Sequence, residues 1–289
     1  METERRIQTQ AALAFHVRPE DVIIVKRLLG GMSHLTYHIR INDEDFTYRI
    51  IGKDGNLFVD RLIEKRNLKI IEPLDINNQT VYFDIESGEK AARYIPGTVL
   101  TQVDHRPYLP WVAKTLKHLH NSNLEPASDY GLIDRLNLYE SYTKIRSHQY
   151  CTLKETWITR YHAHHADKPK VFCHNDAQRS NMVLTDDKLY LLDWEYAGWN
   201  EFYYDIASFG NVQFEDALEL LDVYLGRKAT QEEQNNVRFY RMFQALQWHQ
   251  VATRKHMIGL SEVLHFDFEV LAQKYLDLAQ RLSIEIRGD

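Results

Sequence analysis

The feature that most constrains the fold of this 289-residue sequence is a change of pattern at Pro96-Gly97. Before this break, short apolar runs alternate with tight turns, which is typical of an antiparallel sheet. The expected strands cover residues 22–25, 36–41, 46–51, 81–85 and 90–95. Between the third and fourth strands, apolar residues recur every three or four positions from Val59 to Leu74, which predicts an amphipathic helix. The first third of the chain is therefore expected to form a sheet with one helix.

After the break the pattern becomes helical. Apolar residues recur at helical spacing in 109–119, 217–225, 237–251 and 268–282. The only strands expected in this half are 182–185 and 189–192, which would form a hairpin around Asp186-Asp-Lys188. The sequence thus predicts an α+β fold of two lobes. Residues 1–95 would form an N-terminal nucleotide-binding lobe, and 96–289 a mostly helical catalytic and substrate-binding lobe.

Three polar residues flank this expected hairpin. Asp176 and Asn181 precede its first strand, and Asp193 follows its second. The carboxylate of Asp176 can accept the proton of an attacking hydroxyl, and Asn181 and Asp193 offer the oxygen ligands that Mg²⁺ prefers. Any one of them alone could be an ordinary turn or cap residue. Together, at this spacing, they predict phosphoryl transfer in the arrangement that protein kinases use.

Two segments carry a resemblance to a known family: Phe172-Cys-His-Asn-Asp-Ala-Gln-Arg-Ser-Asn181 and Leu191-Leu-Asp-Trp-Glu-Tyr-Ala-Gly198. They resemble the choline/ethanolamine kinases, and among these the bacterial choline kinases. Tyr204-Asp205-Ile-Ala207 fits the same pattern. The similarity is close over 171–208 and looser over 25–121. It implies the aminoglycoside-phosphotransferase-like form of the protein-kinase fold, with ATP as phosphoryl donor and Mg²⁺ as cofactor.

The resemblance also implies a nucleotide site in the first lobe. Gly30, Gly31 and Ser33 lie between two expected strands, where a kinase folds a hairpin over the phosphates and glycine lets the backbone approach them closely. Arg49 stands where protein kinases carry a phosphate-binding Lys, and its fork of N–H donors suits phosphate oxygens. Glu64 is the expected counter-charge of Arg49, although Asp60 and Glu72 are near in sequence. The adenine is expected against the backbone of 91–95.

For the acceptor, the resemblance places residues matching Gln178, Glu195 and Tyr196 at or beside the substrate pocket. A quaternary ammonium binds through aromatic faces and carboxylates, so Glu195 and Tyr196 are the expected contacts at its cationic end. The family usually adds two tryptophans on a late helix, of which only Trp248 is present here. Choline is the expected acceptor. Ethanolamine, thiamine or an aminoglycoside remain alternatives, and so does an inactive kinase-like binding module.

Composition limits the other function classes. The formal net charge of −6 argues against a dominant nucleic-acid-binding role. No apolar run approaches the ~20 residues that span a bilayer, and no signal peptide is evident at the N-terminus. Cys151 and Cys173 are too few for a disulfide framework or a zinc site. A cytoplasmic enzyme with small-molecule partners is therefore expected.

Overall fold

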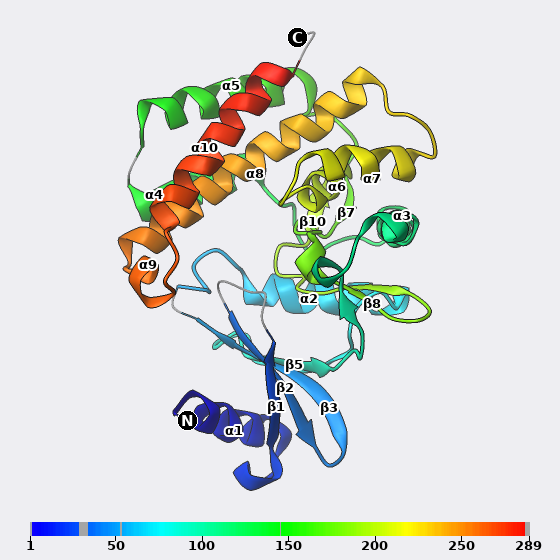
Figure 1. The fold of residues 1–289 in the computed structure, drawn as a ribbon, viewed down its shortest axis with the longest axis vertical. Helices are drawn as coiled ribbons and strands as arrows, with labels where there is room; N and C mark the ends of the chain where they lie inside the picture. Colours follow the sequence, from blue (N-terminus) through cyan, green and yellow to red (C-terminus); the bar gives the residue numbers. More distant parts are fainter. Residues whose placement is uncertain (1, 29–33, 53, 145, 287–289) are drawn as a thin grey trace. The chain divides into compact units, whose positions relative to one another are not determined.

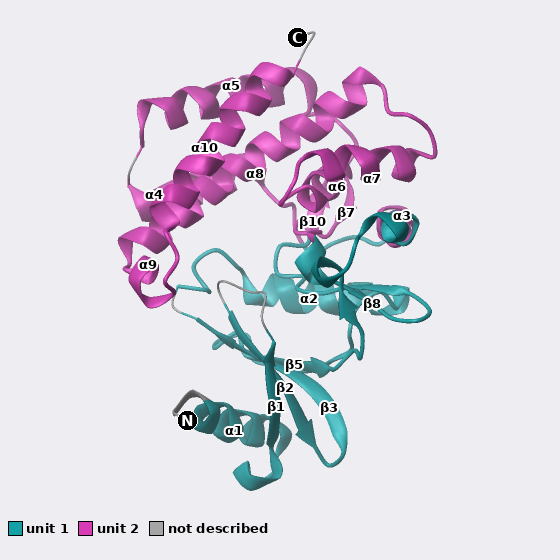
Figure 2. Cartoon of the chain, viewed as in Figure 1, with its two compact units in different colours: residues 1–111, 124–127, 179–197 teal, residues 112–123, 128–178, 198–289 magenta. Residues whose placement is uncertain are grey.

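The computed structural model describes residues 2–28, 34–52, 54–144 and 146–286 (Figure 1). Gly30, Gly31 and Ser33 lie outside the described residues, so their predicted role stays a prediction. Contacts divide the chain into two compact units (Figure 2). Unit 1 comprises 1–111, 124–127 and 179–197, and unit 2 comprises 112–123, 128–178 and 198–289. This division differs from a single cut after residue 95, because residues 96–111, 124–127 and 179–197, the last of which contain the predicted hairpin, join the N-terminal unit.

Unit 1 contains the expected antiparallel sheet. Its strands are β1 (Ile23–Leu28), β2 (His34–Ile41), β3 (Glu44–Ile51), β4 (Thr80–Phe83) and β5 (Lys90–Arg93). They lie in the order β1-β2-β3-β5-β4. An N-terminal helix that the sequence patterns did not predict, α1 (Glu2–Phe15), places Ile7 and Ala11 in one apolar core with Ile39 of β2. This helix covers part of the sheet that would otherwise face water.

The helix α2 (Arg61–Ile71) occupies the predicted position, and the Asp60 carboxylate caps it by accepting from the backbone N–H groups of Leu62 and Ile63. Its buried face differs from the expected one. Leu62 belonged to the predicted apolar face but is 42% exposed. The buried residues of α2 are Arg61, Glu64, Asn67, Leu68 and Ile71. Polar side chains take most of the buried face because they meet charged and backbone partners inside unit 1.

The predicted hairpin is present as β8 (Met182–Leu184) and β9 (Leu189–Leu191). A third strand that was not predicted, β6 (Thr98–Val99), pairs with β8. Gly97 precedes it, and a Cβ built there would stand 2.3 Å from the carbonyl oxygen of Leu184. The backbones approach so closely that only glycine fits, which gives the Pro96-Gly97 break a structural reason.

Unit 2 is mostly helical, as the sequence predicted. Its helices are α3 (Leu109–His120, whose first residues belong to unit 1), α4 (Leu132–Thr143), α5 (His148–His164), α6 (Tyr203–Phe209), α7 (Glu215–Leu225), α8 (Gln231–Met257), α9 (Leu260–Val263) and α10 (Phe268–Glu285). Aromatic residues fill its core: Trp157 of α5 stacks on Phe239 of α8 with ring centroids 4.8 Å apart. None of the described helices is long and apolar enough to cross a membrane.

The prediction that the second half holds only one hairpin was wrong in detail. Besides β6, two three-residue strands are present in unit 2, β7 (Val171–Cys173) and β10 (Gly198–Asn200), and they pair antiparallel. Such short strands carry too few residues for an alternation pattern to reveal them. Because Cys173 pairs with Gly198, the two strands lie side by side at the start and the end of the segment 174–197. This segment contains most of both motifs that resemble the family.

Candidate active site

The hairpin brings the two predicted metal ligands to the same end. Met182 pairs with Leu191 in the ladder, and the N–H of Leu192 donates to the carbonyl of Asn181 at 2.8 Å. Asn181 therefore stands directly before β8, and Asp193 is the second residue after β9, the facing strand. The backbone of Asp193 has φ 65°, a left-handed conformation that is uncommon outside glycine and that Asp tolerates better than most residues.

Next to Asp193, unit 1 buries a cluster of charges. The ion pair expected between Arg49 and Glu64 is present, with Nη2 3.0 Å from Oε2. The second guanidinium nitrogen of Arg49 donates to Asp193 Oδ1 at 3.2 Å. Lys90 adds a contact of 2.8 Å to the other oxygen of Glu64. Asp60 and Glu72, the other candidates for pairing with Arg49, lie elsewhere: Asp60 caps α2, and Glu72 is exposed.

Burial and charge act in opposite directions on these groups. Burial alone would raise the pKa of the Glu64 carboxyl, but Lys90, Arg49 and Arg61 lower it well below its usual range. For Arg49, burial would lower the pKa, and the surrounding carboxylates raise it above its ordinary value. Burial lowers the pKa of Lys90, and neighbouring Arg49 lowers it further. Arg49 and Glu64 are thus both held in their charged forms.

Glu195 belongs to the same buried cluster. Its Oε2 lies 2.8 Å from Nη1 of Arg61 and 2.8 Å from Nε2 of His34. Burial would raise the pKa of this carboxyl, but His34, Arg49 and Arg61 lower it to about 2. Tyr196, the next residue, is buried. Both residues lie in unit 1, so the structure describes Glu195 already in contact with the Arg61 guanidinium and the His34 ring.

In unit 2 the predicted catalytic loop is fixed by one buried carboxylate. Asp205 of α6 accepts from the backbone N–H groups of His174 and Asn175 at 2.8 and 2.7 Å. His120 Nε2 lies 3.0 Å from the same carboxylate. Asn175 has φ 61°, the left-handed conformation that lets the loop turn sharply before Asp176. Asp205 therefore holds the backbone immediately before the predicted base.

Gln178 and Trp248, two of the predicted acceptor residues, also lie in unit 2. The side-chain amide of Gln178 donates to Asp176 Oδ2 at 3.0 Å. Trp248 lies on α8 and is half-buried. The predicted site residues are thus shared between the units: Arg49, Glu64, Asn181, Asp193, Glu195 and Tyr196 belong to unit 1, and Asp176, Gln178 and Trp248 to unit 2.

Sequence reasoning gave no role to Arg61, Asn67, Lys90 or Asp205. For Arg61 and Asn67 a signal existed: with Glu64 they recur every third residue, which places three polar side chains on one face of a helix. Asp205 stood inside a segment that resembled the family, without a function attached to it. Lys90 had no signal, because only the sheet pairing of β3 with β5 brings it beside Arg49.

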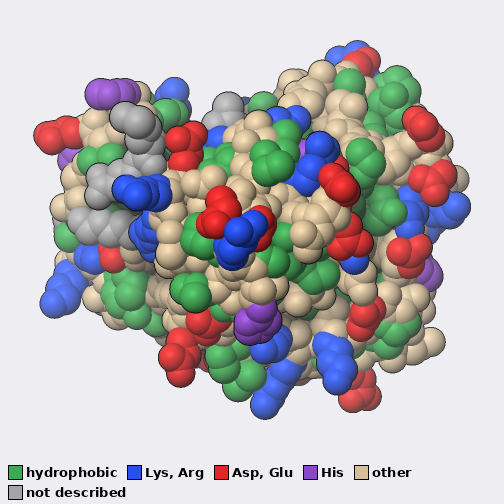
Figure 3. Space-filling view, turned by 90° about the horizontal axis from the view of Figure 1, so that it is seen from below, with side chains coloured by type: hydrophobic (Ala, Val, Ile, Leu, Met, Phe, Trp, Pro, Cys, Tyr) green, Lys and Arg blue, Asp and Glu red, His purple; other side chains and the backbone are tan. Residues whose placement is uncertain are grey.

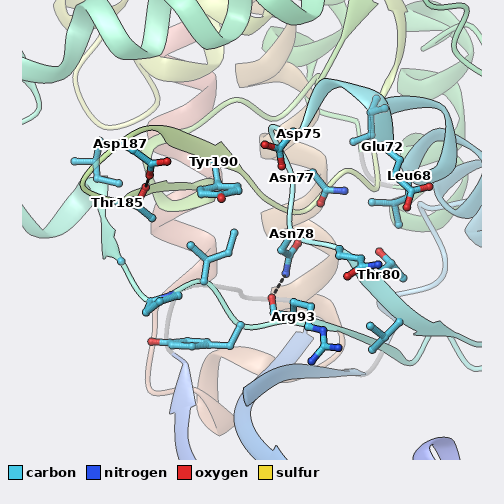
Figure 4. Close-up of a pocket in the computed structure, with 18 of the residues that line it drawn as sticks. Leu68, Glu72, Asp75, Asn77, Asn78, Thr80, Arg93, Thr185, Asp187 and Tyr190 are labelled. Carbon is cyan, nitrogen blue, oxygen red and sulfur yellow. Dashed lines mark hydrogen bonds between the residues drawn. The ribbon is translucent and has the colours of Figure 1, made fainter. Parts of the chain in front are cut away.

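Unit 1 also holds a cavity of about 1450 Å³ (Figure 4). Arg93, Tyr94 and Ile95, the end of the segment predicted to face adenine, line it, together with Asn78 and Tyr190. Figure 4 shows the Asn78 amide donating to the carbonyl of Arg93, at 3.2 Å. Arg49, Glu64 and Asp193 are not among its lining residues, but Phe83 lines it, and the Arg49 guanidinium and the Lys90 ammonium each lie 5.7 Å from the centroid of the Phe83 ring.

One face of the molecule is shown in space-filling form in Figure 3. Basic and acidic side chains are interspersed over the described part of this face, and neither sign forms a continuous field. Nucleic-acid-binding proteins usually gather basic side chains on one face. No such gathering of basic side chains is visible among the described residues of this face.

Comparison with known proteins identifies similar sequences and folds. Residues 24–243 match the phosphotransferase enzyme family. Protein LicA of Haemophilus influenzae is 28% identical over 188 residues, which are 62% of this chain and 56% of that protein. The chain thus matches little more than half the length of this relative. Ethanolamine kinase 2 of Mus musculus is 24% identical over 223 residues, which are 68% of this chain and 54% of that protein.

Solved structures share the fold. Choline kinase LicA from Streptococcus pneumoniae superposes with a TM-score of 0.79 at 20% identity, covering 97% of this chain and 100% of that one. LicA in complex with AMP gives a TM-score of 0.80 at 19% identity, with 98% of both chains covered. An aminoglycoside 2'-phosphotransferase in a GDP complex gives 0.67 at 12% identity, over 96% and 98% of the chains. These neighbours confirm the predicted two-lobed, protein-kinase-like fold class.

Proposed function

The chain belongs to the phosphotransferase enzyme family, and from that premise we propose that it is a choline kinase. It would transfer the γ-phosphoryl group of ATP to the hydroxyl of choline and form phosphocholine. The observation that carries the proposal is the hairpin that brings Asn181 and Asp193 to one end, beside the buried Arg49–Glu64 pair. Within one unit this arrangement would offer a phosphate-binding cation and two metal ligands, which are among the parts that phosphoryl transfer needs.

The donor set fits Mg²⁺. Asn181 offers an amide oxygen and Asp193 a carboxylate, and the Asp193 side chain is 32% exposed although Arg49 contacts it. Hard oxygen ligands with room for water molecules are what this ion selects. When bound, Mg²⁺ would neutralise part of the negative charge on the phosphates. Asn181 and Asp193 are therefore the residues that we propose to hold it.

The remaining residues would position the reactants. Arg49 would hold a pair of phosphate oxygens, with Glu64 fixing its guanidinium, and Gly30, Gly31 and Ser33 would close over the phosphates. Asp176 would accept the proton of the choline hydroxyl as its oxygen forms a bond to the γ-phosphorus. The oxygen that bridges to ADP leaves with the electron pair of the broken bond. The adenine is proposed to lie against the backbone of 91–95.

For the acceptor we propose contacts from Gln178, Tyr196 and Trp248, as the sequence predicted. Gln178 already donates to Asp176, so it stands beside the group that would receive the hydroxyl proton. Glu195 was the fourth predicted residue. Its carboxylate contacts Arg61 and His34, which gives it a competing role within unit 1. The proposed partners are ATP and a small amino-alcohol, and the proposed location is the cytoplasm.

Ethanolamine is the second candidate acceptor, because an ethanolamine kinase is among the similar proteins and because a site with one tryptophan offers fewer aromatic faces to a quaternary ammonium. Thiamine and aminoglycosides are further candidates on this fold. A kinase-like module without activity is the third reading. It is disfavoured by the presence of Asp176, Asn181, Asp193 and Arg49 together.

A radiolabelled-ATP assay with choline, ethanolamine, thiamine and kanamycin as acceptors tests the proposal. We expect the highest kcat/KM with choline. If another acceptor is phosphorylated and choline is not, the proposed acceptor is wrong but the assignment as a kinase stands. Absence of Mg-ATP binding in calorimetry would favour the inactive module.

A further inference from the structure

The helix α2 of unit 1 buries polar residues where a packed helix usually buries apolar ones. Arg61, Glu64 and Asn67 recur every third residue and are 4%, 0% and 0% exposed. Burying charges costs free energy unless each is paired and hydrogen-bonded. A helix face of this kind adds little stability, so the contacts that it makes indicate what it does.

Arg61 and Asn67 contact the segment that follows β9 directly, and Glu64 is linked to it through Arg49. Arg61 contacts Glu195 at 2.8 Å. Glu64 holds Arg49, which donates to Asp193. The side-chain amide of Asn67 donates to the carbonyl of Ala197 at 2.7 Å. Residues 193, 195 and 197 are alternate positions, and every one of them is tied to α2.

Arg61 is also held on its other sides. Its Nη1 lies 2.6 Å from Glu64, its Nε donates to the Asn56 side chain at 2.9 Å, and its Nη2 donates to the carbonyl of Gly55 at 3.1 Å. The planar guanidinium uses each of its nitrogens, which an ammonium could not do. Arg61 is therefore fixed before it contacts Glu195 and can determine where that carboxylate lies.

We propose that Arg61, Glu64 and Asn67 position Asp193 for magnesium, and we call these three residues the α2 clamp. This inference rests on the proposed kinase function. Arg61 and Asn67 are positioning residues, because they act through the backbone of 193–197. Glu195 is the counterpart of Arg61 in this clamp and not the contact of the acceptor's ammonium group. The left-handed conformation of Asp193, φ 65°, is one that the chain seldom adopts without surrounding support.

Calorimetric titration of ATP in the presence and absence of Mg²⁺ tests the clamp without relying on turnover. In Arg61→Gln and Glu195→Gln we expect the Mg²⁺ concentration for half-maximal Mg-ATP binding to rise about tenfold, as is typical when a group that orients a metal ligand is lost. Affinity for ATP without Mg²⁺ should stay within about twofold of wild type. The KM for choline should not change, while kcat at limiting Mg²⁺ should fall.

Two further variants serve as references. Arg66→Gln removes a cation from the exposed face of the same helix and should bind Mg-ATP as the wild type does. Arg61→Lys keeps the charge but loses the fork of donors, and should restore part of the Mg²⁺ affinity lost in Arg61→Gln. Urea unfolding of every variant shows whether it is folded. If Arg61→Gln does not fold, Glu195→Gln, which keeps the shape of the side chain, still tests the clamp.

The outcomes separate the clamp from the proposed function. If Glu195→Gln raises the KM for choline and leaves the Mg²⁺ dependence unchanged, Glu195 is an acceptor contact and the clamp is wrong. If Arg61→Gln and Glu195→Gln both bind Mg-ATP as the wild type does, with the same Mg²⁺ dependence, the clamp is wrong but the proposed function is not affected. A wild-type protein that binds no Mg-ATP would overturn the proposed function, and the clamp with it.

Discussion

The two parts of the predicted active site are held by different forces. In unit 1 Asp193 lies in a cluster of three cations and three carboxylates: Arg49, Arg61 and Lys90 with Glu64, Asp193 and Glu195. In unit 2 the loop that carries Asp176 is held mainly by backbone N–H groups that donate to one carboxylate, Asp205. The part proposed to bind the metal thus depends on side-chain charge, whereas the predicted catalytic loop depends on hydrogen bonds of the backbone.

This difference has a physical consequence. A buried cluster of charges is compensated only as a set, so removal of one member leaves its partners without compensation. A loop held through its backbone tolerates side-chain changes, provided that the accepting carboxylate remains. Mutations in unit 1 should therefore be coupled to one another, and mutations around the loop should be dominated by Asp205.

The largest expected effects are at the proposed general base and at one of the proposed metal ligands. Asp176→Ala and Asp193→Ala should each lower kcat at least ~10³-fold, by analogy with deletion of single catalytic groups. Steady-state kinetics with choline and saturating Mg-ATP measure this. Turnover close to wild type in either variant would contradict the site assignment, and with it the idea that both parts serve one reaction.

The next effect concerns the loop of unit 2. Asp205→Ala should destabilise the protein by roughly 3–5 kcal/mol, because two buried backbone N–H groups and His120 lose a charged acceptor. Asp205→Asn keeps one oxygen and should cost less. Urea unfolding followed by tryptophan fluorescence reports the change. Equal stability of Asp205→Ala and wild type would show that the backbone is held by other contacts.

Glu64→Gln tests the cluster in the same way. It leaves Arg49, Arg61 and Lys90 with one carboxylate fewer, and we expect it to cost about 3 kcal/mol or more. In the double variant Glu64→Gln/Lys90→Met the cost should be smaller than the sum of the single variants, because the two side chains share an ion pair. Additive effects in this double-mutant cycle would refute the coupling proposed for unit 1.

Acid should weaken the charged cluster of unit 1. The folded-state pKa of Glu195 is about 2, against an ordinary value of 4.5, and that of Glu64 is also lowered. A carboxyl with a depressed pKa contributes stability above its unfolded pKa and loses it as the pH falls towards the folded value. Stability should therefore decline between about pH 4.5 and 2, and Glu195→Gln should flatten this decline in urea unfolding measured across that range.

The smallest effect is expected at ion pairs near the surface. Arg227 contacts Glu233 in unit 2, and the Arg227 side chain is 53% exposed while that of Glu233 is 16% exposed. Water and salt screen such pairs, and they contribute little to stability. Arg227→Gln should leave the unfolding midpoint unchanged. A clear shift would mean that surface charge matters as much as the buried cluster does.

Local patterns in the sequence predicted much of this molecule. The strands of the sheet, α2, the hairpin at β8 and β9, and the long helices α8 and α10 follow from periodicity and turn residues, which act over a few neighbouring positions. The Asp–Asn–Asp spacing pointed to phosphoryl transfer for the same reason. Short strands such as β7 and β10 escaped prediction, because three residues carry no pattern and only their pairing defines them.

The sequence by itself determined the fold class and the family, because the signals for both lie in contiguous segments. Short apolar runs alternate with turns in the first third, apolar residues recur at helical spacing later, and two motifs lie between 171 and 198. The tertiary structure decided which charges meet. Arg49 on β3, Lys90 on β5, Arg61 on α2 and Glu195 after β9 are up to 146 residues apart in sequence, from 49 to 195. An ion pair depends on distance in space and on burial, and neither quantity can be read from spacing along the chain.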